Sequence, residues 1–82
     1  MKYRLVVYLR GGTVHTSMWM NNVTFQRIRE HRDVVMNGQD LIIEDQVSGY
    51  NVMFRNDAID AVSIESSLTF KEKVIEFFTL GD

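Results

Sequence analysis

Two adjacent glycines, Gly11 and Gly12, separate two runs of residues that are typical of β-strands. The first run extends over residues 2–10 and the second over residues 13–21. Because glycine adopts positive φ without strain, a pair of glycines suits the two-residue primed turn that joins antiparallel strands. The sequence therefore predicts a β-hairpin with a tight turn at this position.

The position of the turn also predicts which residues face each other across the hairpin. A two-residue turn pairs Leu9 with Val14, Val7 with Thr16, Leu5 with Met18 and Tyr3 with Met20. These residues share one face of the hairpin, and most of them are apolar. We expect this face to pack against the core of the domain.

The opposite face of the predicted hairpin carries basic and aromatic side chains. The same register pairs Tyr8 with His15, Val6 with Ser17 and Arg4 with Trp19. Arg4 is therefore expected to stack its guanidinium on the Trp19 indole as a cation–π contact. Because aromatic and basic side chains on a strand face can stack bases and bind phosphates, this face is a candidate surface for single-stranded nucleic acid.

A helix is expected after the hairpin. Asn22 or Thr24 can act as its N-cap, and helical spacing then turns Phe25 and Ile28 toward the core. The sequence leaves the end of this helix open between two alternatives.

The two alternatives differ in how residues 33–38 fold. In the first, the helix continues to Gly38, which suits the end of a helix, although Arg32 then lies within the apolar face. In the second, the helix ends near Arg32, and residues 34–36 form a tight hairpin with residues 41–43. We favour the longer helix because Gly38 is a suitable terminator.

Strand patterns return after the helix. Residues 41–45 and 50–55 are rich in strand-forming side chains and flank a turn at Ser48 and Gly49. Residues 61–65 alternate apolar and polar side chains, which predicts a fifth strand.

The C-terminal segment predicts a second, short helix. Residues 69–72, Thr-Phe-Lys-Glu, match a capping box, in which the Thr hydroxyl and the Glu carboxylate each accept from a backbone N–H of the first helical turn. Phe70, Val74 and Phe77 then recur at helical spacing, and Gly81 can end the helix.

Together these elements predict a single α+β domain over residues 1–82. Their order is ββαβββα, and the hairpin-rich connectivity favours a mainly antiparallel sheet with the longer helix and the short C-terminal helix packed on it. An apolar content of 45% is typical of a globular chain. Since no apolar run approaches the roughly 20 residues that cross a bilayer, no membrane association is expected.

The sequence lacks the residue patterns on which common active sites depend. It has no cysteine, and His15 and His31 stand apart from other metal-ligating residues. It contains no glycine-rich phosphate loop and no Gly-x-Ser-x-Gly nucleophile motif. Acidic residues are frequent, but no spacing reliably brings two of them together for acid–base chemistry. We therefore expect a protein that is not an enzyme and holds no metal or other cofactor.

Charge is distributed unevenly along the chain. Residues 1–38 carry six Lys or Arg and two Asp or Glu, a net +4, whereas residues 39–82 carry three and nine, a net −6. Because the halves of one small domain interleave, contacts within the domain are the first explanation. Complementary patches for self-association and a basic face for an anionic partner are the alternatives.

A small chain without disulfides or a metal gains stability most simply by association. We therefore expect a protein-interaction, regulatory or assembly module that binds another protein or a second copy of itself. The absence of cysteine and of a secretory signal favours the cytoplasm. Nucleic-acid binding is the alternative function, against which a pI of 5.6 counts. The candidate interaction surface consists of Arg4, Tyr8, Arg10, His15, Trp19, Phe78 and Leu80.

Overall fold

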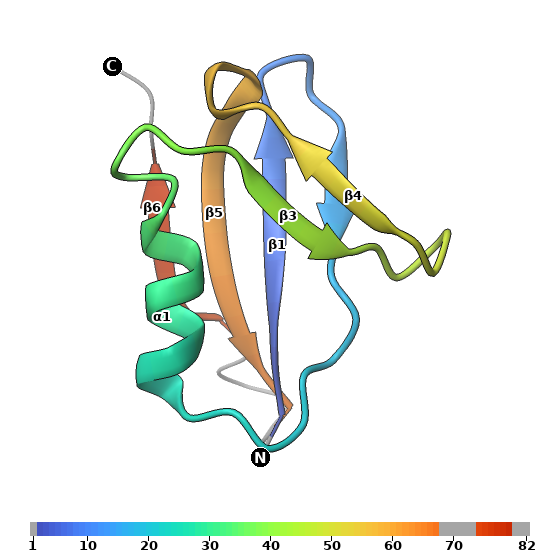
Figure 1. Ribbon diagram of the computed structural model, residues 1–82, viewed down its shortest axis with the longest axis vertical. Helices are drawn as coiled ribbons and strands as arrows, with labels where there is room; N and C mark the ends of the chain where they lie inside the picture. Colours follow the sequence, from blue (N-terminus) through green and yellow to red (C-terminus); the bar gives the residue numbers. More distant parts are fainter. Residues whose placement is uncertain (1, 68–73, 80–82) are drawn as a thin grey trace.

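Four antiparallel strands form the central sheet of the structure, a computed structural model that describes residues 2–67 and 74–79 (Figure 1). The elements are β1 (Tyr3–Leu9), β2 (Val14–Thr16), α1 (Phe25–Asp33), β3 (Leu41–Glu44), β4 (Asn51–Phe54), a short 3₁₀ helix η1 (Asn56–Ala58), β5 (Ile59–Ser66) and β6 (Val74–Thr79). The central sheet has the order β2-β1-β5-β6, and β3 and β4 form a separate antiparallel pair, here called the ribbon. The described residues therefore form a small α+β domain with antiparallel sheets and one α-helix.

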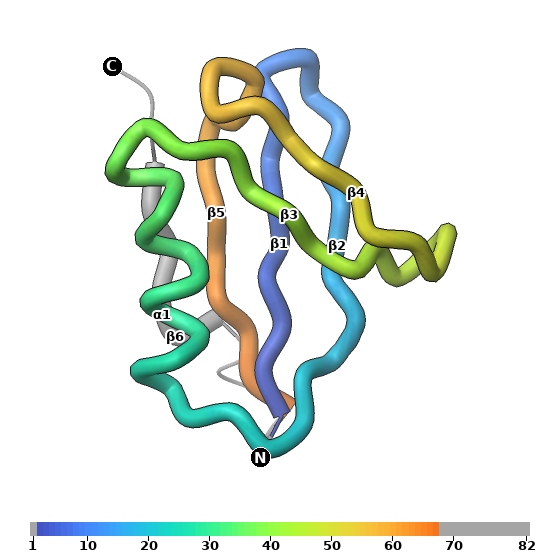
Figure 2. Tube along the Cα trace, in the orientation of Figure 1, coloured from blue at the N-terminus to red at the C-terminus, as the bar shows by residue number. Residues whose placement is uncertain are grey.

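Two elements cover one face of the central sheet. Helix α1 packs against β1 and β5, while the ribbon crosses in front of β1 and β2 and ends in a tip beyond the sheet edge, as the tube in Figure 2 shows. The core lies between these layers and consists of Tyr3, Leu5, Val7, Ile28, Val35, Leu41, Ile43, Phe54, Ile59, Val62 and Ile64. Burial of each large aliphatic side chain in this layer contributes about 1.5–3 kcal/mol relative to leaving it exposed.

The first hairpin forms, but near its turn the strands are displaced by one residue from the predicted register. β1 and β2 pair Val6 with Thr16, Val7 with His15 and Tyr8 with Val14. Of the two turn glycines, Gly12 has a positive φ of 95° and Gly11 does not. The turn closes over a longer loop, in which the Leu9 N–H donates to the Thr13 carbonyl at 2.9 Å. The prediction of a two-residue primed turn is therefore wrong.

At its open end the hairpin has the predicted register. Tyr3 and Met20 pair as expected, and the Met20 N–H donates to the Tyr3 carbonyl at 2.7 Å. Between the two ends, the Ser17 hydroxyl replaces a backbone acceptor and accepts from the Leu5 N–H at 2.9 Å. This irregularity absorbs the residue by which the turn end is displaced.

The displacement changes which side chains are buried, because neighbouring residues of a strand point to opposite faces. Val14 is 53% exposed and Met18 is 40% exposed, although both were expected on the core face. His15 instead pairs with the buried Val7 and lies on the core side, where its ring centroid is 4.9 Å from that of Phe54. The predicted pairing of His15 with Tyr8 on the outer face is wrong.

Helix α1 begins where the sequence predicts. The Thr24 hydroxyl accepts from the Arg27 N–H at 3.2 Å, which makes Thr24 the N-cap. The regular helix ends at Asp33, earlier than the favoured prediction. Arg32 is buried with 3% exposure, and its guanidinium donates to the Asp33 carboxylate at 2.7 and 2.9 Å.

The chain nevertheless continues in helical turns as far as Gly38. The Gly38 N–H donates to the Val35 carbonyl at 3.1 Å, and the Gln39 N–H donates to the Val34 carbonyl at 3.0 Å. Together with the φ of 79° at Gly38, these two bonds form a Schellman motif. Gly38 therefore ends the turns that follow the helix, but the predicted helix as far as Gly38 is wrong because α1 ends at Asp33, and the alternative hairpin around this glycine is wrong as well.

The strands predicted after the helix are confirmed. β3 and β4 pair Leu41 with Phe54, Ile42 with Met53, Ile43 with Val52 and Glu44 with Asn51. β5 extends over Ile59–Ser66, beyond both ends of the predicted strand at residues 61–65. Its length lets it pair along all of β1 in the centre of the sheet.

The short C-terminal helix is not confirmed, because Val74–Thr79 forms strand β6 instead. β6 pairs antiparallel with β5. Its sequence, Val-Ile-Glu-Phe-Phe-Thr, is rich in β-branched and aromatic residues, and pairing with the free edge of β5 outweighs the helical spacing of its apolar residues. The capping box at residues 69–72 and Gly81 lie outside the described residues. No helix among the described residues is long and apolar enough to cross a membrane.

Candidate interaction surface

Arg4 and Trp19, which the sequence predicts to stack, do so in the structure. The Arg4 Cζ lies 4.3 Å from the centroid of the Trp19 ring. The same guanidinium is bound by Glu65 of the neighbouring strand, whose Oε1 lies 2.8 Å from Nη2 and 2.9 Å from Nε. The cation is therefore stacked on one side and neutralised on another, which leaves it poorly suited to binding a phosphate.

The other basic and aromatic residues of the predicted surface do not join this pair. Arg10 follows β1, about 20 Å along the strand from Arg4, and its Nε donates to the Asp57 carbonyl at 3.0 Å. Tyr8 is half-buried between them, and His15 lies on the opposite face of the sheet. Phe78 lies opposite Val62 in the register of β6, and Leu80 lies outside the described residues.

His15 takes part in a different contact, which links β2 to the ribbon. Its Nδ1 lies 3.5 Å from Oδ1 of Asp45, and the backbones of Ser17 and Asp45 form an isolated antiparallel bridge. Asp45 is buried, with 6% exposure. The base of the ribbon is thus attached to the edge of the central sheet.

The Asp45 carboxylate is stabilised in its charged form. The backbone N–H of Ser48, which donates to Oδ2 at 2.9 Å, is the largest cause that lowers the pKa of Asp45 below its ordinary value. Burial opposes this effect, while the Ser48 hydroxyl and His15 add to it. Because the same carboxylate binds the turn and the histidine, we assign it the role of shaping the ribbon.

One of the ion pairs described above joins the two oppositely charged halves of the sequence. Arg4 of the basic N-terminal half binds Glu65 of the acidic C-terminal half. This pair supports the explanation that the two halves complement each other within the domain.

The ribbon carries large apolar side chains on its outer face. Ile42 and Met53 are opposite each other in the register and are 54% and 57% exposed. Val47 and Tyr50, in the segment that connects the two strands, are 95% and 76% exposed. Ile42 and Met53 share the outer face of the two strands, and we call this pair the ribbon face, whereas Val47 and Tyr50 belong to the tip of the ribbon. Exposed apolar side chains that cluster on a small domain are typical of an interaction surface.

Sequence reasoning missed the ribbon face. Methionine usually fills packing space in a core, so its residue type alone does not mark Met53 as an exposed side chain. The available signal was that Leu41–Glu44 has apolar residues on both faces: Leu41 and Ile43 are buried, whereas Ile42 points outward. A strand that covers a sheet with one face needs no apolar residue on the other.

Among the described residues, no three histidine or acidic side chains converge where a metal ion could bind. Comparison of the chain with protein-family models, with curated proteins and with solved structures finds no match. The surface itself is therefore the basis on which a function can be proposed.

Proposed function

We propose that this chain is a non-enzymatic protein-interaction module that self-associates through its ribbon face. The observation that carries the proposal is the pair Ile42 and Met53, which are cross-strand neighbours and both more than half exposed. Removing such side chains from water on contact with a partner is the main favourable term in protein association.

A second copy of the chain is the partner that the charges around the ribbon face favour. Glu44 extends the outer row of β3 at one end of the face. Arg55, which follows the buried Phe54 in extended backbone and is exposed, extends the outer row of β4 at the other end. A two-fold axis that lies in the interface and crosses the line from Glu44 to Arg55 at a right angle places Glu44 of one copy near Arg55 of the other, as a self-complementary interface requires.

The free edge of β4 is compatible with this arrangement. Within the described residues β4 pairs with β3 alone, so one row of its backbone groups is unpaired. An unpaired strand edge can pair with unrelated strands, and proteins commonly protect such edges by covering them. A second copy packed over the ribbon face would leave this edge less accessible to unrelated strands.

Sedimentation velocity over a range of micromolar concentrations tests the proposal. The native chain is expected to form a dimer, and Ile42→Lys and Met53→Lys are expected to be monomers because each buries an unpaired charge in the interface. Val14→Lys and Met36→Lys serve as matched controls, since these residues are 53% and 50% exposed but lie away from the ribbon face. A monomeric native chain, or equal dissociation by the control variants, would contradict the proposal.

A further inference from the structure

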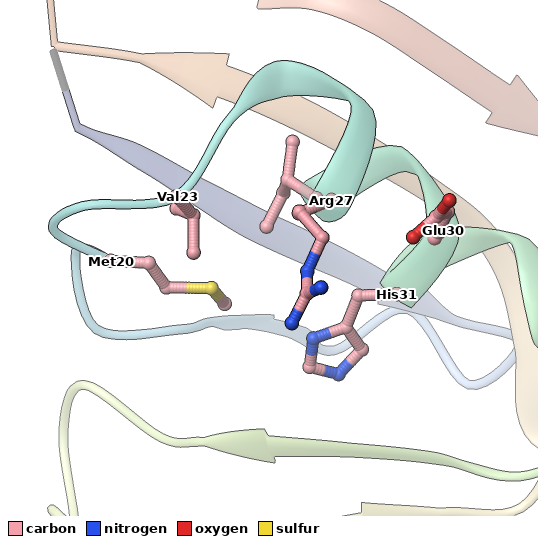
Figure 3. Close-up of a pocket in the computed structure, with 6 residues that line it drawn as sticks. Met20, Val23, Arg27, Glu30 and His31 are labelled. Atoms are coloured by element: carbon pink, nitrogen blue, oxygen red, sulfur yellow. The ribbon is translucent and has the colours of Figure 1, made fainter.

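A hollow of about 370 Å³ lies between the first turns of α1 and the segment that precedes the helix (Figure 3). It is lined by Met20, Val23, Arg27, Ile28, Glu30 and His31. Its volume is at the lower end of the range of small-molecule sites, which are mostly apolar with a few polar groups. None of the residues that line the hollow belongs to the ribbon face, although His31 contacts the backbone carbonyl of Ile42.

One side of the hollow is apolar and held in place by the fold. Ile28 is part of the core, with 1% exposure, and forms the inner wall. Met20 is fixed by its two backbone hydrogen bonds with Tyr3, at 2.7 and 3.3 Å. Asn22 then adopts a positive φ of 58°, which turns the chain between Met20 and Val23. Figure 3 shows the side chains of Met20 and Val23 on the same side of the hollow.

The other side of the hollow carries Arg27 and His31, which lie one helical turn apart. Figure 3 shows the Arg27 guanidinium directed toward the His31 ring. The His31 Nε2 donates to the Ile42 carbonyl at 2.9 Å, which holds the ring in place beside Arg27. The histidine is therefore oriented before any ligand binds.

The charge of Arg27 is not neutralised within the described residues. Its guanidinium has no hydrogen-bond or ion-pair partner among them, and Glu30, which also lines the hollow, forms no ion pair with it. The first turn of α1 contains no acidic residue. By contrast, Arg4 and Arg32 each bind a carboxylate. Arg27 is thus a cation without a carboxylate partner among the described residues, at the edge of an apolar hollow.

We infer that this hollow binds a small organic carboxylate with an apolar chain. The planar guanidinium of Arg27 can bind the carboxylate through two parallel hydrogen bonds, and His31 flanks the same position. The hydrocarbon chain then lies against Met20, Val23 and Ile28 and leaves water. A ligand that has only the carboxylate, or only the hydrocarbon chain, makes one of these two sets of contacts and is expected to bind more weakly.

Titration of the ¹⁵N-labelled chain with octanoate tests the inference by NMR. Octanoate is expected to shift the amide signals of residues 20–31 in a saturable way, whereas octylamine, with the same chain and the opposite charge, and acetate, with the charge and almost no chain, are expected to bind far more weakly. Arg27→Gln is expected to weaken octanoate binding by about ten-fold or more, because a charge-assisted bidentate contact is lost. Arg29→Gln, on the same helix but outside the hollow, is the matched control.

The titration has clear negative outcomes. Equal binding of octanoate and octylamine, or equal affinity of Arg27→Gln and the native chain, overturns the role of Arg27. Absence of saturable shifts at residues 20–31 overturns the site altogether. Because the dimer measurement varies Ile42 and Met53 and the titration varies Arg27, the two tests can fail independently.

Discussion

The carboxylate of Asp45 lies 3.5 Å from Nδ1 of His15 and also accepts the Ser48 N–H, so that one buried charge joins β2 to the turn of the ribbon. The pKa of Asp45 is lowered chiefly by the Ser48 N–H. A carboxylate with a lowered pKa in the folded state binds its proton more readily when unfolded, so it stabilises the fold at pH values above the ordinary aspartate pKa of about 3.9.

We therefore expect the contribution of Asp45 to be complete at neutral pH and to be lost as the pH falls from about 4 through the lowered pKa of the folded state. Asp45→Asn is expected to lower the melting temperature at pH 7 and to reduce the further loss on acidification. Thermal unfolding followed by circular dichroism between pH 7 and pH 3 measures both effects. Asp57→Asn, at a residue that is exposed, is the control. An identical acid response of Asp45→Asn and the native chain would show that Asp45 has no such role.

Replacement of the two turn glycines by alanine separates the observed turn from the predicted one. Gly12 has a φ of 95°, whereas Gly11 does not lie in the left-handed region, and an added Cβ meets no atom within 4 Å at either position. Gly12→Ala is therefore expected to destabilise the domain by about 1 kcal/mol through backbone strain alone. Gly11→Ala is expected to be neutral or slightly stabilising. Chemical denaturation measures the difference, and equal losses at both positions would favour the two-residue primed turn.

The part of the hairpin that the sequence predicts correctly is the part farthest from its turn. Tyr3 pairs with Met20, and Arg4 stacks on Trp19, as the predicted register requires. Near the turn, the hydrogen bond between Leu9 and Thr13 closes a longer loop and shifts the strand register by one residue. The presence of two adjacent glycines does not show which of these loops will form. The same displacement by one residue moved His15 to the other face of the sheet.

Local signals predict the start of the helix and the turn at Gly38, but not the end of the regular helix at Asp33 or the fold of the C-terminal segment. Thr24 and Gly38 act through hydrogen bonds to their near neighbours, so their roles can be inferred from a short stretch of sequence. Val74–Thr79 instead forms β6 by pairing with β5, a contact between separate segments that periodicity cannot show. The ribbon face was missed for a similar reason, because the sequence does not show which face of β3 the sheet covers.

The nucleic-acid alternative makes a distinct prediction for Trp19. Since Glu65 neutralises the guanidinium that stacks on this indole, we expect no salt-sensitive change in Trp19 fluorescence when single-stranded oligonucleotides are added. Glu65→Gln, which frees Arg4 from its partner, tests whether the neutralisation is the reason. Quenching of the native chain that weakens with salt would revive the alternative.

The proposed two-fold packing of the ribbon face makes a prediction that hydrophobic association alone does not. If Glu44 of one copy lies near Arg55 of the other, Glu44→Arg places two cations together at both ends of the interface and weakens the dimer. Arg55→Glu has the equivalent effect, because it brings two carboxylates together.

The double variant Glu44→Arg with Arg55→Glu exchanges the two charges and is expected to restore most of the dimer affinity, measured by sedimentation equilibrium. Each single variant is expected to lose about 1 kcal/mol of association free energy, or roughly five-fold in affinity, since the charges lie at the solvent-exposed rim. Arg55 has a weak competing partner in Asp57 at 3.4 Å, and both side chains are about three-quarters exposed, so this pair offers little resistance to the exchange. Additive losses in the double variant would show that the two residues do not meet, and the second copy would then have to dock in another orientation.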